Sequence, residues 1–447
     1  MTAALTLGID FGTSGARAIA IDASGTIQAQ GRVPFGEASS GLAALWQTAL
    51  FEVIAQLPLS VRQALGAIAI NGTSSTVLIC DDQGRALDEP ILYHDDRGES
   101  CLGLVRAIAP ANHTVISATS SLAKLLWWSM QRVMVTGETE AARADHDPDL
   151  PPIYFLHQAD WLAFALHGQL GISDYHNALK LGYDVGALRY PNWMAQVPSR
   201  FVLPQVLAPG QVIGPITEAI ATRFSIPANC VVCAGTTDSI AAFLASGAHT
   251  PGDAVTSLGS TLVLKLLSQT RIDDPHYGIY SHRLGDLWLV GGASNTGGAV
   301  LRQFFSDDDL ERLSDRIPRD RDSPLDYYPL LRPGERFPIN DPSLEPRLEP
   351  RPDDPVAFLH GLLAGISRIE AEGYRLLRQR GATALRQVYT AGGGAQNQVW
   401  MEMRSRYLGV PVVRSAHTEA AYGSALLARQ GWAKKRSPLL CQTELLD

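Results

Sequence analysis

A single carboxylate, Asp10, interrupts an apolar run near the start of the chain, in the stretch LGIDFGTSGARAIAID. The flanking residues alternate and are rich in Ile and Ala, which predicts two strands joined by a tight turn at Gly12 to Gly15. Such a turn leaves backbone N–H groups free to hold an anion. If the anion is a nucleotide phosphate, Asp10 is placed to orient a hydrated Mg²⁺, which usually takes only one or two carboxylates. The alternative is an ordinary hairpin in which Asp10 caps its own turn.

A second hairpin repeats this plan in the stretch DAVTSLGSTLVLKLL, with Gly259, Ser260 and Thr261 at its tip. Two separated hairpins with Gly, Ser and Thr at their tips indicate two similar halves that face one nucleotide. A third element, QVYTAGGGAQNQVW, is typical of a strand, a glycine-rich turn and a helix. Its glycines permit close backbone approach, and a helix N-terminus favours negative charge. The sequence has neither a P-loop nor a well-placed G-x-G-x-x-G motif, so it does not support those two routes to nucleotide binding.

A second candidate acid, Asp238, lies at a predicted strand-to-helix turn in CAGTTDSIAAFL. A carboxylate at such a turn can accept or donate a proton in catalysis. The alternative is that Asp238 caps the helix that follows. Gly297, in GGASNTGGAV, could let a nucleotide approach a helix start, and close packing is an equal explanation for this glycine.

Composition and charge exclude several classes of protein. Its 46% hydrophobic and 18% charged residues are typical of a globular protein. Its length of 447 residues predicts two or three domains. A formal net charge of -8 gives no electrostatic footprint for nucleic acid or an anionic membrane. No uncharged apolar run reaches the roughly 18 residues that span a bilayer, and the first apolar run lacks a basic leader, so we expect a cytoplasmic protein.

The cysteines and histidines do not form a recognisable metal or redox motif. Five scattered cysteines do not make a disulfide framework, and the C-x-x-C pair Cys230 and Cys233 lies in an apolar strand-like run. We interpret this pair as buried small hydrophobic residues. The histidines show no ligand spacing such as H-E-x-x-H.

Alternating strands and helices predict an α/β fold with largely parallel sheets. Residues 354–381 place apolar side chains on one helical face and end at Gly381, which predicts a core helix with a glycine C-cap. Residues 136–152 predict an exposed loop, and the proline-rich residues 324–355 predict a long ordered loop across the surface.

From end to end, the chain resembles the FGGY carbohydrate kinases. The stretches DFGTSGARA, AGTTDSIAA, SLGST, LDYYPLLRPGERFP and TAGGGAQNQVW are similar to motifs of that family and follow its order. The resemblance implies an actin- and hexokinase-type fold of two ribonuclease-H-like domains, an N-terminal domain at 1–247 and a C-terminal domain at 248–447. It also implies ATP and Mg²⁺ in the cleft between them and a sugar held mainly by the N-terminal domain.

The resemblance implies a role for each matching residue. Asp238 matches the catalytic base, and Asp10 matches the position that arranges Mg²⁺, phosphate and sugar. The implied sugar contacts are Asp10, Ser14, Gly15, Ala16, Arg17, Ser74, Asp95 and Asp238. The implied ATP contacts are Gly12, Thr13, Gly259, Ser260, Thr261, Gly297, Gly393, Gly394, Ala395 and Asn397.

The substrate is inferred from finer likenesses. SDYHNALKLGYD and TTDSIAAFLASGA resemble cyanobacterial and plant sugar kinases that phosphorylate D-ribulose, which implies D-ribulose 5-phosphate as product. LYHDDRG resembles the W-x-D-x-R element of xylulokinases with Tyr93 in place of Trp, so D-xylulose remains the alternative sugar. A noncatalytic actin-like nucleotide switch is the alternative from another class. We expect a monomer or homodimer whose partners are a ketopentose and ATP.

Overall fold

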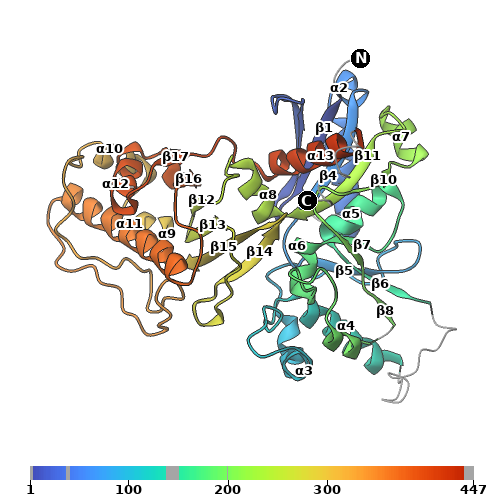
Figure 1. The fold of residues 1–447 in the computed structure, drawn as a ribbon, viewed down its shortest axis with the longest axis horizontal. Helices are drawn as coiled ribbons and strands as arrows, with labels where there is room; N and C mark the ends of the chain where they lie inside the picture. Colours follow the sequence, from blue (N-terminus) through green and yellow to red (C-terminus); the bar gives the residue numbers. More distant parts are fainter. Residues whose placement is uncertain (1–3, 37–40, 137–150, 199, 437–447) are drawn as a thin grey trace, which may run out of the picture. The chain divides into compact units, whose positions relative to one another are not determined.

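The computed structural model describes residues 4–36, 41–136, 151–198 and 200–436. The chain forms two compact units (Figure 1): the first comprises Met1–Leu244 and Glu419–Asp447, and the second comprises Ala245–Thr418. Among the described residues, no helix combines the length and the apolar character needed to cross a membrane. Residues 137–150 of the predicted surface loop lie outside the described residues.

A six-stranded sheet forms the centre of the first unit. Its strands are β1 (Leu5–Phe11), β2 (Gly15–Ile21), β3 (Ile27–Pro34), β4 (Leu65–Gly72), β10 (Val212–Pro215) and β11 (Val231–Thr237). They lie in the order β10-β11-β4-β1-β2-β3, with β1, β4 and β11 parallel. β1 and β2 pair antiparallel, so the predicted first hairpin is confirmed.

The first unit also contains nine helices and two small sheets among its described residues. Its helices are α1 (Leu42–Ala55), α2 (Leu59–Arg62), α3 (Leu102–Ile108), α4 (Ser121–Thr136), α5 (Gln158–His167), α6 (Tyr175–Ala178), α7 (Glu218–Phe224), α8 (Asp238–Ala245) and α13 (Ala420–Arg436). Short 3₁₀ turns are η1 (Arg97–Cys101), η3 (Leu179–Leu181) and η4 (Asn192–Gln196). One small sheet contains β5 (Val77–Cys80), β6 (Ile153–His157) and β8 (Phe201–Val202). The other pairs β7 (Ile172–Asp174) with β9 (Gln205–Leu207).

The C-terminal helix α13 packs on the central sheet of the first unit, beside β1, β4 and β11 (Figure 1). Glycines allow the contact, because a Cβ at Gly8 would lie 1.9 Å from the carbonyl oxygen of Ala421. A Cβ at Gly423 would lie 1.8 Å from the oxygen of Ala241, so this glycine lets α13 also pack against α8. The last helix thus packs with the first unit, whereas the division into domains at 1–247 and 248–447 stays a prediction.

A second six-stranded sheet forms the centre of the second unit. Its strands are β12 (Asp253–Leu258), β13 (Leu262–Ser268), β14 (Tyr280–Leu284), β15 (Leu287–Ser294), β16 (Gln387–Ala391) and β17 (Val412–Arg414), in the order β14-β15-β13-β12-β16-β17. The helices are α9 (Gly298–Arg302), α10 (Asp307–Ser314), α11 (Pro355–Gln379) and α12 (Gln398–Leu408), with 3₁₀ turns η5 (Pro275–Tyr277) and η6 (Gly393–Gln396). β12 and β13 pair antiparallel, so the second predicted hairpin is also confirmed.

The two sheets share one plan. The order β11-β4-β1-β2-β3 corresponds strand by strand to β17-β16-β12-β13-β15. In each, the first two pairings between neighbouring strands are parallel and the last two are antiparallel. The predicted α/β class with two similar halves is confirmed, whereas the prediction of largely parallel sheets is wrong. The reason is that each tight hairpin reverses the chain, which forces antiparallel pairing.

The long helix α11 is the main core helix of the second unit, as predicted. The Asp354 side chain accepts a hydrogen bond from Val356 N and Pro355 fills the first turn, while Gly381 takes a positive φ of 101° beyond the C-terminus. The leucines and isoleucines of the predicted face are all buried: Leu359, Leu362, Leu363, Ile366, Ile369 and Leu377.

Hydrogen bonds to Glu335 stabilise the loop that was predicted over residues 324–355. The Glu335 carboxylate accepts hydrogen bonds from Ser294 Oγ and Tyr328 OH.

A buried ion pair ties α11 to α12. Arg404 Nε and Nη2 donate to the two carboxylate oxygens of Glu370 at 2.6 and 2.7 Å, and both side chains are at most 1% exposed. Thr256 Oγ1 donates to the same carboxylate at 2.5 Å. We expect Arg404→Met to lower the free energy of unfolding by about 3–5 kcal/mol, because it leaves a buried carboxylate without its counter-charge.

Urea unfolding of the full chain measures this loss, and Arg404→Met/Glu370→Met is the control. The double variant should lose less than the sum of the single losses, because it removes both charges together. A loss below about 1 kcal/mol for Arg404→Met would show that the ion pair does not stabilise the second unit.

Candidate active site

Three polar residues lie side by side at the carboxyl ends of the parallel strands of the first unit. Asp10 on β1 is in register with Asn71 on β4, which is in register with Thr236 on β11. The carboxyl edge of parallel strands is where ligands bind in many open α/β sheets. Asp238 follows two residues after Thr236, as the first residue of α8. The fold thus gathers both predicted acids, which are separated by more than 200 residues in sequence.

The Asp10 side chain is largely buried and its Oδ1 atom has no hydrogen-bond partner. Burial raises the pKa of Asp10 from 3.8 to about 7, and the nearby negative charge of Asp238 adds to the shift. Arg17 opposes it. A buried carboxylate without a partner is costly in a folded protein, and perturbed acids of this kind occur preferentially at functional sites.

Other buried polar atoms without partners belong to the same edge of the sheet. They lie at or just after the carboxyl ends of β4 and β11: Asn71 Oδ1, Ser75 Oγ and Thr237 Oγ1. Such atoms are few in folded proteins and usually have an explanation, such as a bound water, ion or ligand. Their grouping at one edge of one sheet indicates a place for a polar ligand.

Arg17 lies opposite Asp10 across the hairpin, since the two residues are in register on β1 and β2. Its guanidinium forms an ion pair with Glu419, which immediately precedes α13. Sequence reasoning missed Glu419, because a partner 402 residues away leaves no local signal. Glu419 also raises the pKa of Asp10. Arg17 therefore lies between two carboxylates, one from each end of the chain.

The other predicted residues of the first hairpin differ in what they can offer a ligand. Thr13 and Ser14 are exposed at its tip. Ala16 is 0% exposed and points into the core, so only its backbone is available. A Cβ at Gly15 would lie 2.5 Å from the oxygen of Val33, which accounts for that glycine through strand packing. Gly12 has more room, since a Cβ there meets nothing closer than 3.8 Å.

Ser74 and Asp95 lie on two loops of the first unit. Ser74 is half-buried in the turn between β4 and β5. Asp95 accepts hydrogen bonds from Arg97 Nε and Nη2, the shortest of 2.6 Å, and these bonds hold the pKa of Asp95 below its ordinary value. Tyr93, at the position that separates this element from the xylulokinase pattern, is 43% exposed.

Two basic residues near Asp238 were not predicted. His176 Nδ1 hydrogen-bonds Thr236 Oγ1 at 2.7 Å, which brings α6 to the end of β11. Lys180 lies four residues later, in η3. Burial lowers the pKa of Lys180, and the Asp238 carboxylate partly restores it, so the two charges are near each other. A sequence signal for both residues was present in the stretch SDYHNALKLGYD, where His176 precedes Lys180 and Lys180 lies between two leucines.

The second unit holds the other predicted ATP contacts. Gly259 and Ser260 accept backbone hydrogen bonds from Gly298 N and Ala299 N at 2.9 and 3.1 Å, so the hairpin tip lies against the start of α9. Gly297 has a φ of 147°, and a Cβ there would lie 2.7 Å from Ser260 O. Close packing therefore accounts for Gly297. Thr261 is half-buried at the tip.

The glycine-rich turn after β16 leaves one open position. A Cβ at Gly393 meets nothing within 4 Å, whereas one at Gly394 would lie 2.7 Å from the Trp400 ring. Ala395 is buried. Asn397 caps α12, because its Oδ1 accepts a hydrogen bond from Trp400 N at 2.9 Å. The predicted strand, turn and helix are confirmed, and the ATP contacts within them stay predictions.

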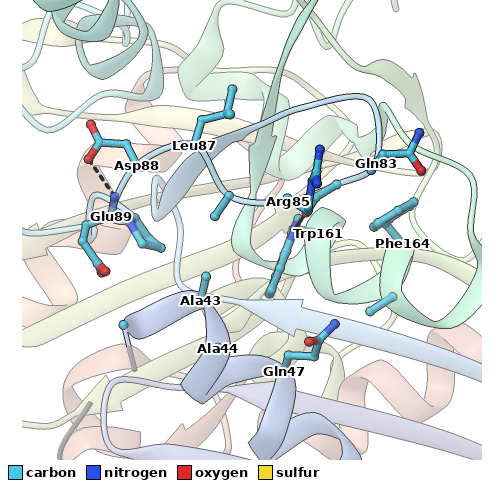
Figure 2. Close-up of a pocket in the computed structure, with 15 residues that line it drawn as sticks. Ala43, Ala44, Gln47, Gln83, Arg85, Leu87, Asp88, Glu89, Trp161 and Phe164 are labelled. Carbon is cyan, nitrogen blue, oxygen red and sulfur yellow. Dashed lines mark hydrogen bonds between the residues drawn. The ribbon is translucent and has the colours of Figure 1, made fainter. Parts of the chain in front are cut away.

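A pocket of about 560 Å³ opens elsewhere on the first unit (Figure 2). Trp161 and Phe164 of α5 form one wall, Ala43, Ala44 and Gln47 of α1 another, and the loop 83–90 the third. Trp161 Nε1 donates to Gly84 O at 2.8 Å, which holds this loop against α5. The predicted site residues are not among those that line this pocket.

The cysteines behave as small apolar residues. Cys230 and Cys233 are buried and unbridged, and burial raises the pKa of both thiols to about 12. Within the part of the chain that the structure describes, no three His, Cys, Asp or Glu side chains gather in a way that could hold a metal ion. The interpretation of the C-x-x-C pair as buried small residues agrees with the burial of both.

Comparisons with known proteins cover nearly the whole chain. Residues 5–245 match the family model described as "FGGY family of carbohydrate kinases, N-terminal domain", and residues 254–432 match the corresponding C-terminal domain. Among curated proteins, a xylulose kinase of Staphylococcus epidermidis is 21% identical and covers 97% of this chain and 90% of its own length. A xylulose kinase of Escherichia coli is 24% identical, over 89% of this chain and 83% of its own.

Solved structures support the same fold. The crystal structure of xylulose kinase from Rhodospirillum rubrum has a TM-score of 0.77 at 22% identity and covers 97% of this chain and 90% of its own. That of gluconate kinase from Lactobacillus acidophilus has a TM-score of 0.78 at 17% identity, with the same coverage of 97% and 90%. The predicted two-domain fold of sugar kinases is therefore confirmed.

Proposed function

Because the chain belongs to the FGGY family of carbohydrate kinases, we propose that it transfers the terminal phosphoryl group of ATP to a ketopentose, with D-ribulose preferred. Sugar phosphorylation by ATP follows from the family, whereas the sugar and the residue roles are part of the proposal. The observation that supports it most is the pair of acids, Asp10 and Asp238, at the carboxyl edge of one sheet.

Asp238 is assigned as the base that accepts the proton of the attacking hydroxyl. It begins α8 directly after a parallel strand, so its backbone lies between two regular elements. Phosphoryl transfer needs little covalent chemistry from the protein, and most of the acceleration comes from placing the hydroxyl in line with the phosphoryl group. Ser74, Asp95 and Arg17 are assigned to hold the sugar in that position.

Asp10 is assigned to the metal. The residues present fit Mg²⁺, because Asp10 offers a buried carboxylate oxygen without a partner and Mg²⁺ usually takes one or two protein carboxylates beside waters and phosphate oxygens. When bound, Mg²⁺ would neutralise charge on the phosphates of ATP. Thr13 and Ser260 at the hairpin tips, and the backbone at Gly393, are assigned to ATP.

The choice between the two sugars rests on the loop that bears Tyr93. The curated relatives named xylulose kinase favour D-xylulose as the second candidate. Tyr93 in place of Trp, together with the likeness of residues 173–184 to D-ribulose kinases, favours D-ribulose. One inverted hydroxyl is discriminated by a few contacts, so this loop can decide between them.

A substrate panel tests the proposal. We expect D-ribulose to give the highest kcat/KM among D-ribulose, D-xylulose, ribitol, arabitol and glycerol, measured by coupled ADP release. A tenfold preference for D-xylulose, about 1.4 kcal/mol of transition-state discrimination, would establish the second candidate instead. A rate of ATP consumption that none of these sugars raises above its sugar-free value would favour the noncatalytic nucleotide switch.

A further inference from the structure

Lys124 on α4 is 0% exposed, which is rare for lysine because an ammonium is costly to remove from water. Its Nζ donates to Ser75 O at 2.8 Å and to Leu92 O at 2.7 Å. Burial lowers the pKa of Lys124 to about 7, against the opposing charge of Asp95. Both acceptors are backbone oxygens, so the contact fixes the path of the chain at two points.

The first point lies in the turn that bears Ser74. Ser75, the next residue, has a φ of 64°, a left-handed conformation that a residue other than glycine seldom adopts. Such a conformation persists where the surrounding structure holds it. The Lys124 hydrogen bond to Ser75 O is one of the contacts that do so.

The second point lies at the base of the loop that bears Asp95. Leu92 O accepts hydrogen bonds from both Lys124 Nζ and Asp95 N, at 2.7 and 3.1 Å. The two loops are also joined directly, because Tyr93 N donates to Thr76 Oγ1 at 3.0 Å. Lys124 therefore touches both segments where they meet.

The same helix supports the second loop at two further places. Trp128 Nε1 donates to Asp88 Oδ2 at 3.0 Å. The Arg97 guanidinium, which holds Asp95, lies 4.7 Å from the centre of the Trp127 ring. α4 thus forms a platform for residues 88–97, and Lys124 is the part of it that also reaches the turn at Ser74.

We propose that Lys124 is a positioning residue of the sugar subsite, whose buried side chain sets the spacing between Ser74 and Asp95. This inference rests on the proposed function, which supplies these two residues as sugar contacts. It predicts a selective effect: a chain without the Lys124 hydrogen bonds should bind its sugar poorly and its nucleotide normally.

Lys124→Met tests this by removing the donor while keeping an unbranched side chain. We expect the KM for D-ribulose to rise by about tenfold or more, with the KM for ATP changed by less than about twofold. Lys434→Met is the matched control, because Lys434 is exposed on α13 and the same substitution there should change neither KM. Lys124→Gln keeps an N–H donor without the charge, and should give an intermediate KM for the sugar.

Hydrogen exchange provides a readout that needs no activity. The amides of Tyr93 and Asp95 should exchange faster in Lys124→Met than in the wild type, whereas the amides in the hairpin of β12 and β13 should exchange at the same rate.

The outcomes separate the inference from the proposed function. If the wild type phosphorylates no ketopentose, the proposed function fails, and unchanged hydrogen exchange in Lys124→Met would then also overturn the role of Lys124. If the wild type is active, an unchanged sugar KM, or an equal rise in both KM values, would overturn the inference while the proposed function stands. Should Lys124→Met fail to fold, the same measurements on Lys124→Gln decide.

Discussion

Replacing Asp238 by Asn is expected to lower sugar-dependent turnover by about 10²–10⁴-fold, the usual cost of losing a general base. Asn has the same shape and can still accept the 2.6 Å hydrogen bond that Asp238 Oδ1 accepts from Ser239 N. It cannot take up a proton from the sugar hydroxyl. Nucleotide affinity should be unchanged, because the change removes proton affinity and leaves the geometry of the turn in place.

Steady-state ADP release with sugar measures turnover, and calorimetry measures nucleotide affinity. Asp308→Asn is the matched control, since Asp308 is exposed in the first turn of α10 and the same chemical change there should leave both quantities unaltered. Near-normal sugar phosphorylation by Asp238→Asn would show that another group accepts the proton.

Replacing Asp10 by Asn is expected to give a different pattern, with weaker binding of Mg²⁺-ATP as well as lower turnover. The Asn side chain lacks the negative charge that a magnesium ligand supplies, although it fills the same buried space. The slow hydrolysis of ATP by water in the absence of sugar should fall too, whereas Asp238→Asn should leave it intact. Calorimetric titration with Mg²⁺-ATP and a sugar-free ADP assay separate the two variants. Equal loss of nucleotide binding in both would contradict the division of roles.

The ionisation of Asp10 also makes stability depend on pH. Its pKa is about 7 in the folded chain against 3.8 ordinarily, so between these values the folded state binds more protons than the unfolded state. The contribution of Asp10 to the free energy of unfolding is therefore fully present below about pH 4 and is lost as the pH rises through about 7. Without metal or nucleotide, the free energy of unfolding should fall over this range relative to Asp10→Asn, by a few kcal/mol at most. Urea unfolding at pH 5 and pH 8 measures this. An equal change in the free energy of unfolding of the wild type and of Asp10→Asn between the two pH values would contradict the prediction.

The elements that depend on neighbouring residues could be predicted from the sequence. Both hairpins, the strand, glycine turn and helix around Gly393, and the core face of α11 rest on alternation, helical spacing and turn chemistry. The position of Asp10 was visible for the same reason, because an acid inside an apolar strand breaks a local pattern. Asp238 was visible as an acid at a strand-to-helix turn, and its role came from the resemblance of the whole motif.

Only the tertiary structure decided which of these elements meet. The sequence suggested largely parallel sheets, whereas the sheets in the structure are mixed, and no local pattern indicated that α13 packs against Gly8 of the first unit. Glu419 and Lys124 left no sequence signal, because an ion pair 402 residues apart and a lysine bonded to two backbone oxygens do not follow any local periodicity. Local patterns determine secondary structure through short-range sterics and burial, whereas the partner of a buried charge is fixed only when distant strands and helices are brought into contact.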